Sequence, residues 1–178
     1  YMLNELEEIH DIKTEKGSLA NIDIINKIVE VTSKINREIC VAINRKGSVI
    51  GISIGDSNTA SLPIIDTSKS KLSGVRIIHT HPNSSAKLSN VDISALQAMR
   101  LDVISAIGIT DDKITGVSLG FCKFIDGELS YEDSPILTID EIESMDISGK
   151  YEKIEKEFRE NEIKEDNLER AIIVGIDT

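Results

Sequence analysis

Two histidines and an aspartate within fourteen residues carry the clearest chemistry of this 178-residue chain. His79 and His81 are separated by one residue, and Ser89 and Asp92 follow in the same stretch. Imidazole nitrogens and carboxylate oxygens are common zinc ligands, and three such ligands leave a fourth position open for water. The stretch therefore predicts a hydrolytic zinc site, in which the metal polarises a carbonyl and lowers the pKa of its water toward about 7.

A hydrolytic site of this kind also needs a base and a donor to the oxyanion. Glu38 is the candidate base, because it opens the first strand expected in the chain and can pass a proton from water to a leaving amine. The Ser89 hydroxyl can donate to a tetrahedral oxyanion. Two alternatives stay open: Glu38 as an exposed residue without a catalytic role, and Ser89 with Asp92 as a capping box that needs no metal.

The periodicity of apolar residues predicts an α/β (α+β) fold in which helices lie on a mixed sheet. A short buried strand over 75–78 runs directly into His79, and alternation along a strand places His79 and His81 on one face. Asp92 lies about one turn inside a helix expected over 88–101. The other expected elements are helices over 3–12, 22–35 and 152–169, and strands over 38–44, 48–55, 103–109, 116–125, 129–131 and 171–176.

The composition argues against several classes of protein. The chain has no apolar run of membrane-spanning length and no signal-like N-terminus, which predicts a cytoplasmic protein without membrane contact. Cys40 and Cys122 lie far apart in apolar segments, as buried reduced thiols do.

The net charge of −11 is concentrated near the C-terminus. Residues 126–170 hold 16 acidic and 6 basic side chains, a balance of −10. A basic patch with interleaved aromatic residues is the usual sign of a nucleic-acid interface, and the sequence has none. We therefore expect no direct nucleic-acid binding by this chain.

The spacing of the histidine stretch resembles the motif of the JAMM (MPN+, JAB-like) metallohydrolases. That motif reads His, Ser or Thr, His, seven residues, Ser, two residues and Asp, and a proline often follows the second histidine, as Pro82 does here. The resemblance implies a three-layer, cytidine-deaminase-like domain with a mixed sheet. It also implies His79, His81 and Asp92 as zinc ligands and Ser89 as the oxyanion helper.

The same resemblance implies Glu38 as the acid/base. This role is carried over from the place of Glu38 on a first strand, whereas the other four residues match the motif by spacing.

A second resemblance covers more of the chain. Residues 35–47, 76–81, 88–92 and 100–102 look like the N-terminal extension of HflX-type GTPases, and residues 169–175 look like the opening strand of that family's conserved N-terminal domain. In that family the His-Thr-His segment is often followed by leucine rather than proline.

The HflX resemblance implies a ribosome-associated GTPase as the parent protein. The implied partners are the rest of that chain and the large ribosomal subunit. The sequence has no G-x-x-x-x-G-K-[ST] motif, so GTP and Mg²⁺ would bind only in a GTPase domain outside this chain.

These patterns predict four parts: a helical lead-in over 1–36, a JAMM/MPN-like domain over 37–135, an acidic and solvated helical linker over 136–168, and the first strand of a following, truncated domain over 169–178. Three functions stay open. The chain is a zinc-dependent amide (peptide) hydrolase, a catalytically silent domain that contacts the ribosome or the GTPase domain, or a RadC-like DNA-repair accessory domain. The acidic balance counts against the last of these.

Overall fold

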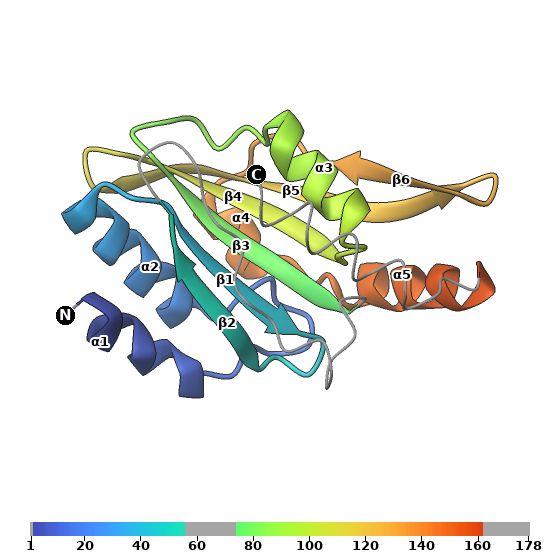
Figure 1. Cartoon of the computed structure of the whole chain (residues 1–178), viewed down its shortest axis with the longest axis horizontal. Coiled ribbons are helices and arrows are strands. Elements are labelled where there is room, and N and C mark those ends of the chain that lie inside the picture. The colour runs from blue at the N-terminus through green and yellow to red at the C-terminus, as the bar shows by residue number, and fades with distance from the viewer. Residues whose placement is uncertain (1, 56–73, 162–178) are drawn as a thin grey trace.

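A six-stranded mixed sheet forms the centre of the structure, a computed structural model that describes residues 2–55 and 74–161. The strand order is β2-β1-β3-β4-β5-β6 (Figure 1). The pair β3–β4 is parallel, and the other four neighbouring pairs are antiparallel. The strands are β1 (Ile39–Asn44), β2 (Val49–Ile54), β3 (Val75–Pro82), β4 (Val103–Thr110), β5 (Lys113–Ile125) and β6 (Glu128–Asp133).

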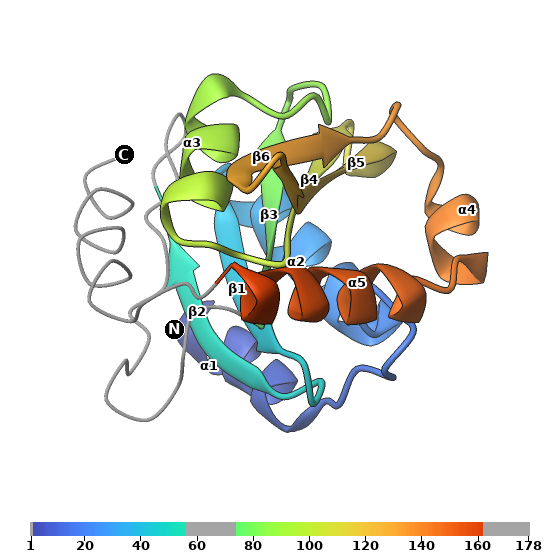
Figure 2. The same cartoon turned by 90° about the vertical axis from the view of Figure 1, so that its right-hand side faces the viewer.

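Helices lie on both sides of this sheet, which confirms the α+β class and the mixed sheet with flanking helices. Figure 2 shows α3 on one side, with α2 and α5 on the other. The JAMM/MPN-like identity of the fold stays a prediction. The helical elements are α1 (Met2–Glu7), η1 (Glu8–Asp11), α2 (Ile22–Ile35), α3 (Asn90–Ala98), α4 (Ile139–Ser144) and α5 (Ser148–Glu160).

The alternation of β3 decides which side chains meet which helix. His79 contacts Asp92 of α3, whereas the next residue, Thr80, hydrogen-bonds Thr32 of α2. Because successive side chains of a strand point to opposite faces, His81 shares the α3 face with His79. The strand extends to Pro82, so both histidines lie within regular structure rather than beyond its end.

Helix α5, which lies within the acidic C-terminal region, packs on the sheet instead of extending into solvent as the expected linker would. Tyr151, Ile154 and Phe158 of α5 are all buried. The Phe158 ring meets Phe124 of β5 edge to face, with 5.5 Å between centroids, and Tyr151 lies under the Arg76 guanidinium at 4.9 Å. Although most residues of α5 are charged, about one residue per turn is apolar, and these apolar residues are enough to pack the helix against the sheet.

Some expectations fall partly outside the described residues. The strand expected over 171–176 and the end of the helix expected over 152–169 are among them. The short helix α4 was not expected from the sequence. The domain boundaries inferred above stay a prediction. Among the described residues, no helix is long and apolar enough to cross a membrane.

We expect Phe158→Ala to lower the free energy of unfolding by about 3 kcal/mol, because it removes a buried ring and leaves a cavity between α5 and the sheet. Lys156→Ala is the matched control on the same helix, since its side chain is 69% exposed. The control is expected to change stability by less than about 0.5 kcal/mol. Urea unfolding measures both, and equally small effects would mean that α5 is a solvated helix after all.

Candidate metal centre

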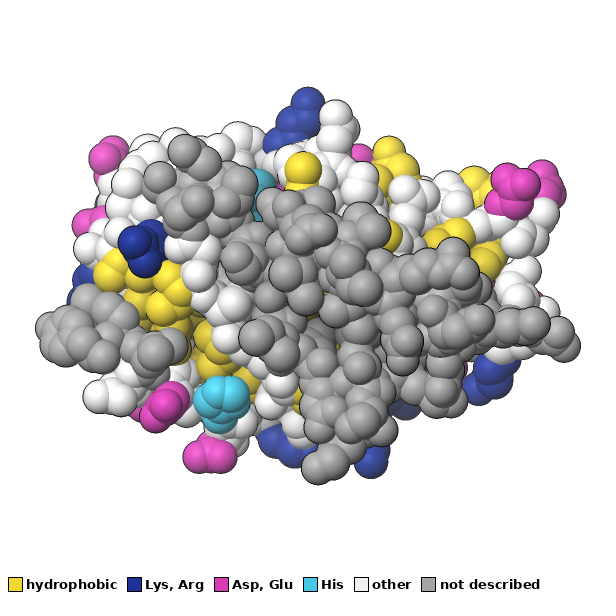
Figure 3. Space-filling view, viewed as in Figure 1, with side chains coloured by type: hydrophobic (Ala, Val, Ile, Leu, Met, Phe, Trp, Pro, Cys, Tyr) yellow, Lys and Arg dark blue, Asp and Glu magenta, His cyan; other side chains and the backbone are white. Residues whose placement is uncertain are grey.

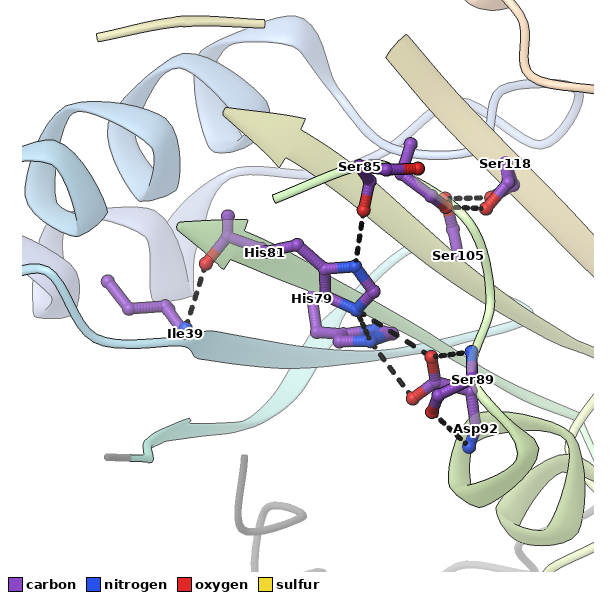
Figure 4. Close-up of polar contacts among 10 residues, drawn as sticks. Ile39, His79, His81, Ser85, Ser89, Asp92, Ser105 and Ser118 are labelled. Carbon is purple, nitrogen blue, oxygen red and sulfur yellow. Dashed lines mark hydrogen bonds and ion pairs between the residues drawn. The ribbon is translucent and has the colours of Figure 1, made fainter. Parts of the chain in front are cut away.

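The side chains of three candidate ligand residues converge where β3 passes the start of α3 (Figure 4). The Nε2 atoms of His79 and His81 lie 2.9 Å apart. The Asp92 carboxylate places one oxygen 3.1 Å from His79 Nε2 and the other 3.6 Å from His81 Nε2. Ligand atoms of a tetrahedral zinc site, with bonds of about 2.0–2.1 Å, are separated by about 3.3 Å. These separations, of which two involve different Asp92 oxygens, are close to this value. With one ligand atom taken from each residue, the atoms of His79, His81 and Asp92 all lie within 4.8 Å of one another, so the group can hold a metal ion.

The group is largely shielded from solvent but not sealed. His79 is 3% exposed, and the side chains of His81 and Asp92 are 12% and 13% exposed. In the space-filling view, acidic and basic side chains are interspersed around the outline of the face that carries α3 (Figure 3). Because the three side chains are so little exposed, the candidate centre is a low-dielectric site in which electrostatic interactions are stronger than in water.

The hydrogen bond of the second histidine fixes its tautomer. His81 Nδ1 lies 2.8 Å from the Ser85 carbonyl oxygen, which can only accept, so Nδ1 is the donor. A neutral His81 then presents the lone pair of Nε2 toward Asp92 and His79. A ligand histidine whose other nitrogen donates to a carbonyl is the usual arrangement at metal sites, because it orients the ring and makes the ligand more basic.

The electrostatics of the group favour a cation. Burial would raise the pKa of Asp92, but hydrogen bonds to His79 and His81 outweigh it and hold that pKa far below its usual range. Burial would lower the pKa of His81, yet hydrogen bonds to Asp92 and Ser85, with the charges of Asp92 and Glu38, raise it. The raised pKa of His81 reflects the negative charges of Asp92 and Glu38 beside it, and these charges attract a cation that reaches the site.

Capping and metal ligation are compatible in this structure, although the sequence posed them as alternatives. Ser89 Oγ accepts from Asp92 N at 3.1 Å, and an Asp92 oxygen accepts from Ser89 N at 2.9 Å, which completes the capping box of α3. The oxygen that caps the helix is the one nearer His81, and the other faces His79. The cap therefore holds the carboxylate in place for the two imidazoles.

The pairing of β1 with β3 brings Glu38 to the same region. Cys40 lies directly opposite His79 in the antiparallel register, and Glu38 precedes Cys40 by two residues, so alternation directs both to the histidine face. Gly55 N donates to the Glu38 carbonyl, which continues the β1–β2 pairing through this residue. The charge of Glu38 acts on both Cys40 and His81. The proton-transfer role of Glu38 stays a prediction.

Cys40 lies outside the group of candidate ligands, which among the described residues consists of His79, His81 and Asp92. Burial raises the pKa of its thiol, and the charges of Asp92 and Glu38 raise it further. The expectation that both cysteines are buried and free is confirmed.

The loop between β3 and α3 depends on residues that the sequence did not single out. A Cβ atom at Gly108 of β4 would lie 2.7 Å from the Ala86 backbone nitrogen, so only glycine lets the loop approach this closely. Ser118 of β5 donates its hydroxyl to the Ala86 carbonyl. The loop carries the Ser85 carbonyl that orients His81, and glycine within a strand is the signal that could have pointed to such an approach.

We expect Gly108→Ala to weaken zinc binding by about tenfold or more, because the added methyl group displaces the loop that carries the Ser85 carbonyl. Gly149→Ala is the matched control: a Cβ there meets nothing within 4 Å, and alanine favours helix. Competition with a zinc chelator measures the affinities of both variants. Equal affinities would show that the loop does not control His81.

Comparison with known proteins does not assign the chain to a family. No protein-family model, curated protein or solved structure matches the chain. The chemistry assigned to the site therefore rests on the His79, His81 and Asp92 side chains themselves and on the elements that orient them.

Proposed function

We propose that this chain is a zinc-dependent amide (peptide) hydrolase on a JAMM/MPN-type scaffold. The observation that carries the proposal is the convergence of two imidazole nitrogens and one carboxylate from β3 and α3, with Glu38 immediately before the adjoining strand β1. Zinc held by these three ligands would supply Lewis acidity, polarising an amide carbonyl and making water a nucleophile near neutral pH.

Glu38 is the proposed general base and then the general acid. It takes a proton from the attacking water as the new carbon–oxygen bond forms. It then gives that proton to the amide nitrogen as the carbon–nitrogen bond breaks, which releases an amine and a carboxylic acid and returns Glu38 to its ionised form. The negative potential that raises the pKa of His81 includes the charge of Glu38, which supports its closeness to the ligand group.

Ser89 is the proposed donor to the oxyanion that develops on the substrate carbonyl. Its oxygen already accepts from the Asp92 backbone N–H, which fixes the position of the hydroxyl while leaving its own proton free to be donated. A preorganised donor of this kind stabilises the charge of the transition state more than that of the substrate.

The larger protein is a separate proposal. The sequence resemblance to HflX-type GTPases supports a role as an accessory domain of a ribosome-associated GTPase. The JAMM-type scaffold is supported by the spacing of the motif, by the mixed sheet and by the placement of the ligands on a strand and the following helix.

Hydrolysis of a mixed library of fluorophore–quencher peptides by the zinc-loaded chain tests the function. We expect cleavage by the unaltered protein, and a loss on the order of 100-fold or more in kcat for Glu38→Gln, which retains zinc but cannot accept the proton. The double variant His79→Ala, His81→Ala is expected to lose zinc and activity together.

His10→Ala is the matched control for this experiment, because His10 is exposed in η1 and lies outside the ligand group. The control should retain both zinc and cleavage. Cleavage that persists at full rate in Glu38→Gln would contradict the role of Glu38 as the base. An absence of cleavage with the zinc site filled would contradict the hydrolase and favour the catalytically silent domain.

A further inference from the structure

Thr80, the residue between the two histidines, contacts the start of β1, next to Glu38. Thr80 is fully buried, and its side chain points away from the candidate metal centre, toward α2. Its hydroxyl oxygen accepts from the Ile39 backbone N–H at 2.9 Å. The paired register of β1 and β3 ends at Cys40 and His79, so this side-chain bond continues the attachment by one residue, to the neighbour of Glu38.

The same hydroxyl is held from the helix side. Thr80 Oγ1 and Thr32 Oγ1 lie 2.7 Å apart, and Thr32 is fully buried in α2. The Thr32 carbonyl also accepts from Asn36 N, the residue that ends α2 in a left-handed conformation with φ 53°. A pair of buried hydroxyls therefore connects the last turn of α2 to the C-terminal part of β3.

The short segment from Asn36 to Ile39, which contains Glu38, is hydrogen-bonded at both of its ends. Asn36 at its start is bound to Thr32, and its side-chain oxygen accepts from Asn83 Nδ2 at 2.9 Å. Ile39 at its end is bound to Thr80. Thr80 in β3 and Asn83 just after it lie on either side of His81 in the sequence, so the part of the chain that carries the two histidines also binds the segment that contains Glu38.

We propose that Thr80 is a positioning residue, whose hydroxyl sets the place of Glu38 relative to the His79–His81 pair. This inference rests on the proposed hydrolase, since Glu38 is given its role there. Thr80 touches neither the ligand atoms nor the substrate, so it acts through the Ile39 backbone. A valine has the same shape but cannot accept from Ile39 N–H, whereas a serine can.

The test compares Thr80→Val with Thr80→Ser in the whole chain. We expect Thr80→Val to leave zinc affinity unchanged and to lower kcat on the order of 10- to 100-fold with KM unchanged, because the base is displaced and the ligands are not. Thr80→Ser should restore kcat. In the Glu38→Gln background, Thr80→Val should cause no further loss.

Amide hydrogen exchange gives a readout that does not need activity. The Ile39 N–H should exchange faster in Thr80→Val, on the order of tenfold, while amides of the β4–β5 pairing keep their rates. A uniform rise in all rates, a parallel loss of zinc affinity and kcat, or a Thr80→Ser variant as impaired as Thr80→Val would overturn the proposal, since each indicates a purely structural role.

A second variant acts on the same segment from the surface and keeps the test decisive if Thr80→Val does not fold. Asn83→Gly removes the side chain that binds Asn36 and tolerates the φ of 53° at this position. It should lower kcat and leave zinc affinity unchanged, and an unchanged kcat would count against the positioning of Glu38. Zinc-loaded protein that hydrolyses nothing would defeat the proposed function, and Ile39 exchange would still decide whether Thr80 holds the start of β1.

Discussion

The Asp92 carboxylate is the contact on which the candidate centre depends. It closes the first turn of α3 by accepting from the Ser89 backbone, and it meets both imidazoles of β3. A largely shielded carboxylate is costly unless it is paired, and the two histidines and the helix cap supply its partners. The same carboxylate keeps the potential of the site negative, and this is the condition for holding a metal ion there.

The rest of the fold positions β3 and α3, the two elements whose side chains meet at Asp92. The parallel pairing of β3 with β4 requires a crossover, and α3 supplies it, which returns the chain beside the histidines. The loop before α3 reaches its position because Gly108 has no side chain and because Ser118 binds the Ala86 carbonyl. On the opposite face, Thr80 joins the strand of the ligands to α2 and β1. Contacts on both faces of β3 therefore help to set the geometry of the candidate metal centre.

Local sequence patterns predict the parts of this arrangement that depend on neighbours in the chain. The bounds of α2 follow from its apolar spacing and from Asn21, which caps it. The common face of His79 and His81 follows from strand alternation, and the capping box follows from Ser89 and Asp92.

The remaining features depend on partners far away in the sequence. Thr80 meets Thr32 across 48 positions, and Ser118 meets Ala86 across 32, so no window of local sequence reveals either contact. The apolar stripe of α5 is sparse, and its burial depends on the surface that β5 offers, so the charge of the segment alone suggested a solvated linker. Tertiary packing decides such segments, and a pattern of charges does not.

The central claim is that His79, His81 and Asp92 bind zinc, and X-ray absorption at the zinc edge tests it most directly. Protein purified without added metal is measured together with its zinc content. We expect close to one zinc per chain, with imidazole nitrogens and a carboxylate oxygen bound to the metal at about 2.0–2.2 Å and no bound sulfur. Less than about a tenth of an equivalent of zinc, or a first shell without imidazole, would contradict it.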